Sequence, residues 1–131
     1  MTELALILTA LLFGGMVLYA FGFAAFAFHA LPHDVAGPFI RRAFPYFYVF
    51  VFASALLAGG AALFADRTSM ALLAAIAITT IFARQILMPA INDATDAGNK
   101  KRFAMLHTIS VLITLAHIAA AGVTLVLLAR L

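Results

Sequence analysis

The sequence predicts an all-α integral membrane protein, a bundle of four transmembrane helices built from two antiparallel hairpins. Two observations support this prediction. Of the 131 residues, 66% are hydrophobic and only 10% are charged, which is too little charge to cover the surface of a soluble domain. The charged residues also divide the chain into four apolar runs, each close to the roughly 20 residues that a helix needs to span a bilayer.

The positions of the charged residues define the spans. No charge occurs between Glu3 and Asp34, or between Arg42 and Asp66. The predicted spans of this single domain, residues 1–131, are 4–28, 44–65, 69–92 and 103–129. Helices are the expected element, because lipid leaves backbone groups unsatisfied in any open arrangement of strands. The first span starts without basic residues and is long for a signal peptide, so we expect it to be retained.

Basic residues predict the orientation of the spans. They gather in two connections, at Arg41–Arg42 and at residues 100–102, whereas the opposite side has only Arg67 and Arg130. Because cytoplasmic connections carry the excess of Lys and Arg, the first and third connections are expected in the cytoplasm. Both termini are then expected on the non-cytoplasmic side, and the membrane is expected to be a bacterial inner membrane. Residues 66–68 are predicted to form a tight turn.

The two cytoplasmic connections share a layout. The first reads Pro32, Asp34, Gly37, Arg41–Arg42 and Phe44, and the third reads Pro89, Asp93, Gly98, Lys101–Arg102 and Phe103. Each is predicted to end a helix at proline and to turn through Asp and Gly, and Pro45 is expected in the first turn of the second helix. The shared layout favours a duplicated hairpin. Turn residues and basic flanks common to all cytoplasmic connections would also produce it.

Arg84 is the one charge inside a predicted span. It lies eight residues before Asn92, or roughly 12 Å from the end of that span at 1.5 Å per residue. A charge at this depth needs a partner or must reach the interface. The acidic side chains in reach belong to the rim residues Asp34, Asp93 and Asp96. Backbone carbonyls, a bound anion and a lipid headgroup are the alternatives.

The fourth span carries a polar stripe. His107, Ser110, Thr114 and His117 are spaced by three, four and three residues, so they share one helix face, which Thr124 extends. Polar side chains of a span are expected to face the bundle interior. Together with Arg41, Arg42, Arg84, His33, Asp34 and Asp93, these residues make a polar cluster that either binds an anionic ligand or has a structural role.

The histidines allow a second interpretation. His29 and His107 lie at similar depth near the cytoplasmic side, and two axial ligands are enough to hold haem b between helices. Interhelical hydrogen bonding is the alternative role. No metal site is predicted, because no spacing typical of metal ligands and no acid within a span is present. A G-x-S-x-G motif is also missing, so no catalytic residue is predicted.

Residues 28–33, Gly37 and the Phe44–Phe47 stretch, followed by Arg84, Pro89 and Arg102–Phe103, resemble the transmembrane-protein-205-like family, known as domain of unknown function 4149. The resemblance covers nearly the whole chain. It implies a four-helix membrane protein without an assigned activity, whose eukaryotic relatives are associated with tolerance of platinum drugs. A fainter likeness to four-helix membrane protoporphyrinogen oxidases implies a haem site but lacks that family's tryptophans.

These observations favour a non-enzymatic membrane protein. We expect an accessory or interaction subunit, or a module that binds a small molecule or lipid through its cytoplasmic-side polar cluster. The alternatives are a haem b redox protein using His29 and His107, and an oligomeric transporter or exporter. The expected partners are the lipid bilayer, a membrane-protein complex or further copies of the chain, and no nucleic acid.

Overall fold

The computed structural model describes residues 1–131, all of whose regular structure is helical. Four helical rods are long and apolar enough to cross a membrane, namely Thr2–Ala30, His33–Ala62, Arg67–Asp96 and Lys100–Ala129. The predicted fold class is therefore confirmed. At 1.5 Å per residue, a rod of 30 residues is about 45 Å long. Because the hydrocarbon core is only about 30 Å thick, the rod ends reach the headgroup layers.

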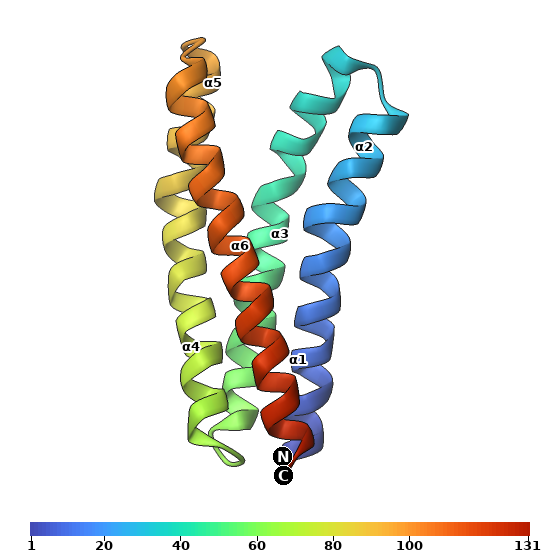
Figure 1. The fold of residues 1–131 in the computed structure, drawn as a ribbon, viewed down its shortest axis with the longest axis vertical. Coiled ribbons are helices and arrows are strands. Elements are labelled where there is room, and N and C mark those ends of the chain that lie inside the picture. The colour runs from blue at the N-terminus through green and yellow to red at the C-terminus, as the bar shows by residue number, and fades with distance from the viewer.

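The four rods form two hairpins, and two of the rods are interrupted. The first hairpin contains α1 (Thr2–Val17), the π-helical segment η1 (Leu18–Phe23), α2 (Ala24–Ala30) and α3 (His33–Ala62). The second contains α4 (Arg67–Phe82), the π-helical segment η2 (Ala83–Leu87), α5 (Met88–Asp96) and α6 (Lys100–Ala129). The termini and the α3–α4 connection lie at one end, and the ribbons of the hairpins diverge toward the other (Figure 1).

Contacts between the rods differ between the two ends of the bundle. Toward the termini, α1 packs on α3 and α6, and α4 packs on α3 and α6, so each rod has two neighbours. Toward the opposite end, α2 packs on α3 and α5 packs on α6. The hairpins are therefore held together mainly at the terminal end. We call the opposite end, which holds both the α2–α3 and the α5–α6 connections, the open end.

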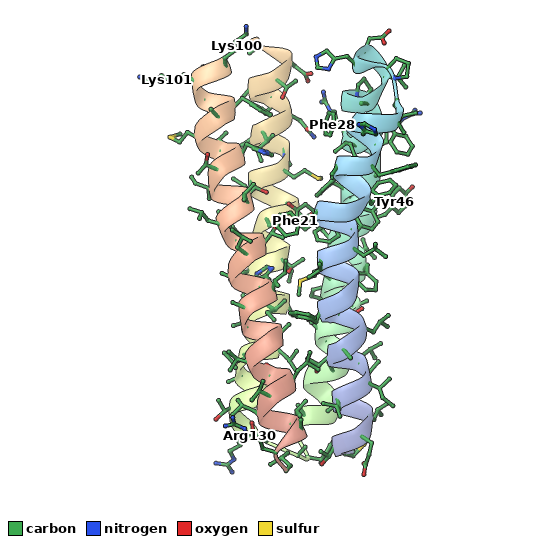
Figure 2. All side chains as sticks on the ribbon, turned by 45° about the vertical axis from the view of Figure 1, so that its right-hand side comes forward. Phe21, Phe28, Tyr46, Lys100, Lys101 and Arg130 are labelled. Atoms are coloured by element: carbon green, nitrogen blue, oxygen red, sulfur yellow. The ribbon has the colours of Figure 1, made fainter.

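Charge is unevenly placed along the bundle. Lys100 and Lys101 lie at the open end, whereas Arg130 lies at the terminal end (Figure 2). Arg41 and Arg42 are exposed in the part of α3 that belongs to the open end. This is the asymmetry on which the predicted orientation depends.

The first connection is shorter than predicted. Leu31 is extended, with φ −100° and ψ 151°, because the ring of Pro32 disfavours the helical conformation in the residue before it. The helix α3 then starts at His33, so the interpretation of Asp34 and Gly37 as turn residues is wrong. Both lie in the first two turns of α3, which includes the residues predicted to form the loop.

Pro45 lies inside α3 and not in the first turn of a helix, so that prediction is also wrong. A proline in a helix removes one backbone N–H and leaves the carbonyl four residues earlier without its partner. The carbonyls concerned belong to Asp34, opposite Pro38, and to Arg41, opposite Pro45. Both are in the polar part of α3, where water and headgroups can donate to them.

The other two connections match the prediction in part. The chain turns over residues 63–66, and the carboxylate of Asp66 caps α4 by accepting from the Ser69 amide at 2.7 Å. At the open end, Gly98 adopts φ 67°, and the Asn99 side chain caps α6. Pro89 does not end its helix. It lies at the start of α5, just after η2, where backbone hydrogen bonds that span five residues give way to bonds that span four.

The core is narrow and built from small and branched residues. Only 26 of 131 residues are buried, which leaves most large apolar side chains facing the lipid. Gly15 permits a close approach, because a Cβ there would collide with the ring of Phe50. Gly14 and Gly60 face open space. Close packing that requires a glycine is thus seen at Gly15 but not at those two positions.

The two hairpins share one architectural feature that supports duplication. α1 and α4 are both 16 residues long, and each is followed by a π-helical segment, of 6 and 5 residues respectively. Each hairpin then returns through an uninterrupted helix of 30 residues. The correspondence lies in the position of the π-helical segments, and it differs from the proline-based correspondence that the sequence suggested.

Candidate ligand groove between the hairpins

Two cavities lie between α3 of the first hairpin and the α4–η2–α5 rod of the second. The upper cavity, near the open end, has a volume of about 780 Å³. Its polar lining consists of Asp34, Arg41 and Arg42 from α3 and Asn92 from α5. This volume falls within the range of ligand sites, which is about 300–1,000 Å³.

The lower cavity lies deeper along the same two rods. Its volume is about 330 Å³. Apolar side chains of Val49 and Phe52 from α3 and Ile81 from α4 line it, next to Tyr48, Arg84 and Gln85. Val49 and Ile81 are each half exposed, so this cavity opens sideways toward the lipid.

Arg84 lies between the two cavities. Its side chain lines the lower cavity, and its Nε–H donates to the carbonyl of Pro45 at 3.3 Å, while Pro45 lines the upper cavity. The two cavities therefore lie one after the other along α3, on either side of the Arg84–Pro45 contact, and we call the pair the interhairpin groove. The groove has charged and amide groups at the open end and apolar walls deeper in the bundle.

The partners of Arg84 resolve one of the sequence-based alternatives. Besides the Pro45 carbonyl, its Nη1 donates to Oε1 of Gln85 at 2.8 Å. Neither bond involves an acidic side chain, so the expected partners Asp34, Asp93 and Asp96 are not those that the structure shows. A backbone carbonyl takes that place. The guanidinium keeps further N–H groups that no protein atom accepts.

One ion pair connects the hairpins across the upper cavity. Arg41 donates from Nη1 and Nη2 to the two carboxylate oxygens of Asp96, at 2.6 and 3.0 Å. This bidentate geometry makes the pair stronger and fixes its orientation. Both side chains are half exposed, and screening weakens a pair in such a position. It nevertheless gives Arg41 a carboxylate partner and connects the third turn of α3 to the last residue of α5.

Arg42 and Asp34 remain unpaired in the same cavity. The only side-chain ion pair of the structure is that of Arg41 with Asp96, and neither Arg42 nor Asp34 makes a side-chain hydrogen bond. Both are exposed. The upper cavity thus presents one free guanidinium, one free carboxylate and the amide of Asn92.

The polar stripe of the fourth span faces the interior over most of its length. Ser110 lies 3.3 Å from the hydroxyl of Tyr48 on α3, and His117 Nε2 lies 2.6 Å from Thr79 Oγ1 on α4. His117 and Thr124 are buried and Thr114 is half buried. The expectation of an inward stripe is confirmed for these residues.

His107 departs from that pattern. It is exposed and stacks on Phe103 of its own helix, with ring centroids 5.4 Å apart. His29 and His33 are exposed as well. The rod of His29 packs on α3 at this end, whereas α6 there packs on α5. The structure thus does not bring His29 and His107 together, and neither lines a cavity described above.

Sequence reasoning missed several residues of the groove. Asn92, Gln85 and Tyr48 supply polar atoms to the cavities. Ile81, Gln85 and Asn92 are spaced so that they fall on the same helix face as Arg84. This spacing could have identified them from the sequence. A further residue, Tyr19 of η1, donates to the carbonyl of Ala43 at 2.8 Å, so side chains from both π-helical segments contact the Ala43–Pro45 stretch of α3.

The fold and the groove define a four-helix integral membrane protein with two cavities between its hairpins. The chain belongs to the family described as domain of unknown function (DUF4149), whose model matches residues 7–100. That match covers the whole groove and confirms the predicted membership of DUF4149. No curated protein and no solved structure matches the chain. The likenesses to transmembrane protein 205 and to protoporphyrinogen oxidases stay predictions.

Proposed function

We propose that this protein is a lipid-binding module that holds a phosphate-bearing amphiphile, a phospholipid, in the interhairpin groove. One observation carries the proposal: a charged cavity and an apolar cavity lie in sequence along α3, and Arg84 of the apolar cavity is bonded to Pro45 of the charged one. An amphiphile has the same two parts in the same order. The groove opens at the depth where lipid headgroups lie, because the rods extend beyond the hydrocarbon core.

The guanidinium groups are suited to the phosphate. Arg42 has no protein partner, and Arg84 uses only part of its N–H groups. Arginine binds phosphate through paired N–H donors and is less strongly hydrated than lysine, which favours it in partly dry sites. A phosphate held by Arg42 and Arg84 would also reduce the cost of keeping the charge of Arg84 inside the bilayer.

The apolar part of the groove is suited to an acyl chain. Val49, Phe52 and Ile81 form its walls, and the half-exposed side chains leave the chain a lateral route from the bilayer. A water-soluble phosphate ester could use the arginines but would leave these walls uncovered. Lipid is therefore the favoured source of the phosphate.

We further propose that the groove opens at the cytoplasmic leaflet of a bacterial inner membrane, with both termini on the other side. The clusters Arg41–Arg42 and Lys100–Arg102 support this orientation. The chain contains no cysteine, so single cysteine substitutions can report the orientation. In intact cells, Thr68→Cys should react with a membrane-impermeant maleimide and Asn99→Cys should not. The reverse labelling would overturn the orientation and leave the groove unaffected.

Native mass spectrometry of the delipidated protein tests the binding proposal. Phosphatidylglycerol is added back in neutral detergent, and its affinity is compared among variants. Each lost charge-assisted hydrogen bond is worth about 1.5–3 kcal/mol, so Arg42→Gln and Arg84→Gln should each weaken binding by about tenfold or more. Arg102→Gln, an exposed arginine on α6 at the same end, is the matched control and should bind as the unmodified protein does. Equal affinity in all three variants would refute the proposal.

A further inference from the structure

We infer that the upper cavity selects a phospholipid whose headgroup carries a primary ammonium group, as phosphoethanolamine does, and that Asp34 accepts from that ammonium. This inference rests on the proposed function, because it assumes that the groove holds the phosphate. It adds the chemical class of the headgroup, on the evidence of the charges that line the cavity.

The balance of charge in the cavity favours a zwitterion. The lining carries Arg41, Arg42 and Asp34, but the charge of Arg41 is already neutralised by Asp96. One guanidinium and one carboxylate remain without a protein partner. A headgroup with a phosphate and an ammonium satisfies both of them. A purely anionic headgroup satisfies Arg42 and brings its charge near Asp34, which is unfavourable.

Asp34 also has a structural explanation. It is the second residue of α3, and an acid in the first turn favours the helix through the helix dipole. It makes no capping hydrogen bond, however, since no side chain caps this helix. The dipole effect acts on the stability of α3 and is indifferent to the headgroup, so the two roles can be separated by experiment.

The chemistry of the lining favours a primary over a quaternary ammonium. A primary ammonium has three N–H donors, which can meet the carboxylate of Asp34 and the side-chain oxygen of Asn92. A quaternary ammonium donates no hydrogen bond and is recognised mainly by cages of aromatic rings. Phe39 is the only aromatic residue lining the upper cavity, which is too few for such a cage.

The test compares three phospholipids with identical acyl chains: phosphatidylethanolamine, phosphatidylcholine and phosphatidylglycerol. Each is titrated separately into the delipidated protein, and bound lipid is measured by native mass spectrometry. We expect phosphatidylethanolamine to bind about tenfold more tightly than phosphatidylcholine, as the loss of charge-assisted hydrogen bonds implies. Asp34→Asn should remove this preference and should strengthen the binding of phosphatidylglycerol.

Glu3→Gln is the control, because Glu3 is an exposed acid at the terminal end, away from the cavity. It should retain the preference for phosphatidylethanolamine. A second readout, the thermal midpoint of each variant, identifies any effect of Asp34 on folding. If Asp34→Asn destabilises the protein but leaves the preference unchanged, Asp34 acts only on the helix and the inference is overturned.

The failure of this inference can be told apart from failure of the proposed function. If all three lipids bind the unmodified protein equally while Arg42→Gln still weakens each of them, the phosphate site stands and the ammonium site is refuted. If neither Arg42→Gln nor Asp34→Asn alters the binding of any lipid, both are refuted.

Discussion

The hydrogen bond between His117 and Thr79 allows a prediction of how much stability is lost when either residue is replaced. That prediction depends on which of the two side chains donates. The Thr79 hydroxyl has one proton, and it lies 2.7 Å from the carbonyl of Ala75 in its own helix. If that proton stays on the Ala75 carbonyl, the 2.6 Å contact to His117 is a bond donated by Nε2–H. We therefore expect His117 to be the Nε2–H tautomer, which nitrogen-15 NMR of the labelled histidine can identify.

With this assignment, replacing Thr79 and replacing His117 should have different costs in stability. Thr79→Val leaves the N–H of His117 buried without an acceptor, since His117 is only 8% exposed. An unsatisfied buried donor costs about 1–3 kcal/mol. His117→Leu removes only the donor, and Thr79 keeps its bond to Ala75. Interhelical hydrogen bonds in membranes contribute about 0.6 kcal/mol on average and at most about 1.7, so the loss of the bond itself is small.

A double-mutant cycle measures the difference. We expect Thr79→Val to lower the free energy of unfolding by about 1–3 kcal/mol in the unmodified protein and by far less in the His117→Leu background. The assay is unfolding in mixed bicelles by sodium dodecyl sulfate, followed by circular dichroism. Thr108→Val is the control, because Thr108 donates to Ala104 in its own helix and makes no hydrogen bond to a histidine. Equal costs of Thr79→Val in both backgrounds would refute the reasoning.

Three further predictions concern the helix ends and the bridge between the hairpins. The nearby Ser69 hydroxyl and the Ser69 amide hold the pKa of Asp66 below its ordinary value, so the stability from this cap is present above the ordinary carboxyl range and is lost as pH falls through the lowered pKa. The protection of the first-turn amides of α4 against hydrogen exchange, relative to the intrinsic rate at each pH, should therefore fall in acid. Asp66→Asn, still a good cap, should remove that pH dependence, and an unchanged profile would contradict the assignment. Gly98→Ala should cost about 1 kcal/mol in unfolding by detergent, because φ 67° is strained for alanine, whereas a helical glycine in open space, Gly37, should tolerate alanine or gain from it. Asp96→Asn should release Arg41 and raise the affinity for phosphatidylglycerol in native mass spectrometry, and a reduced affinity would show that the ion pair supports the groove.

The four spans were predictable because insertion in lipid leaves few alternatives. A stretch without charge that is long enough to cross the bilayer has to be helical, and the charge-free gaps between Glu3 and Asp34 and between Arg42 and Asp66 mark two such stretches. The boundaries were less predictable, since α3 extends to His33 and runs through two prolines. Proline acts as a helix breaker through one lost hydrogen bond, and that cost is small where water and headgroups replace the lost donor.

The groove shows what the sequence could indicate and what it could not. Arg84 stood out because a charge inside a span is costly, but its partner, the Pro45 carbonyl, lies 39 residues away in the sequence. Arg41 and Asp96 are 55 residues apart. Such pairs depend on how the two hairpins diverge, and this divergence is not encoded in the periodicity of any one helix. The π-helical segments η1 and η2 likewise have no recognised signature in the sequence.

Photo-crosslinking with a phospholipid that carries a diazirine in its acyl chain tests the lipid-binding groove most directly. The lipid is incorporated at low fraction into bilayers containing the protein, and the adducts are located by peptide mass spectrometry. We expect adducts to concentrate on Val49 and Ile81, which line the groove, and to disappear from them in Arg84→Gln. Leu57 and Val126 are about equally exposed on lipid-facing surfaces outside it, and their labelling should be weak and unchanged. Uniform labelling of all four side chains, unaffected by Arg84→Gln, would contradict a specific lipid site.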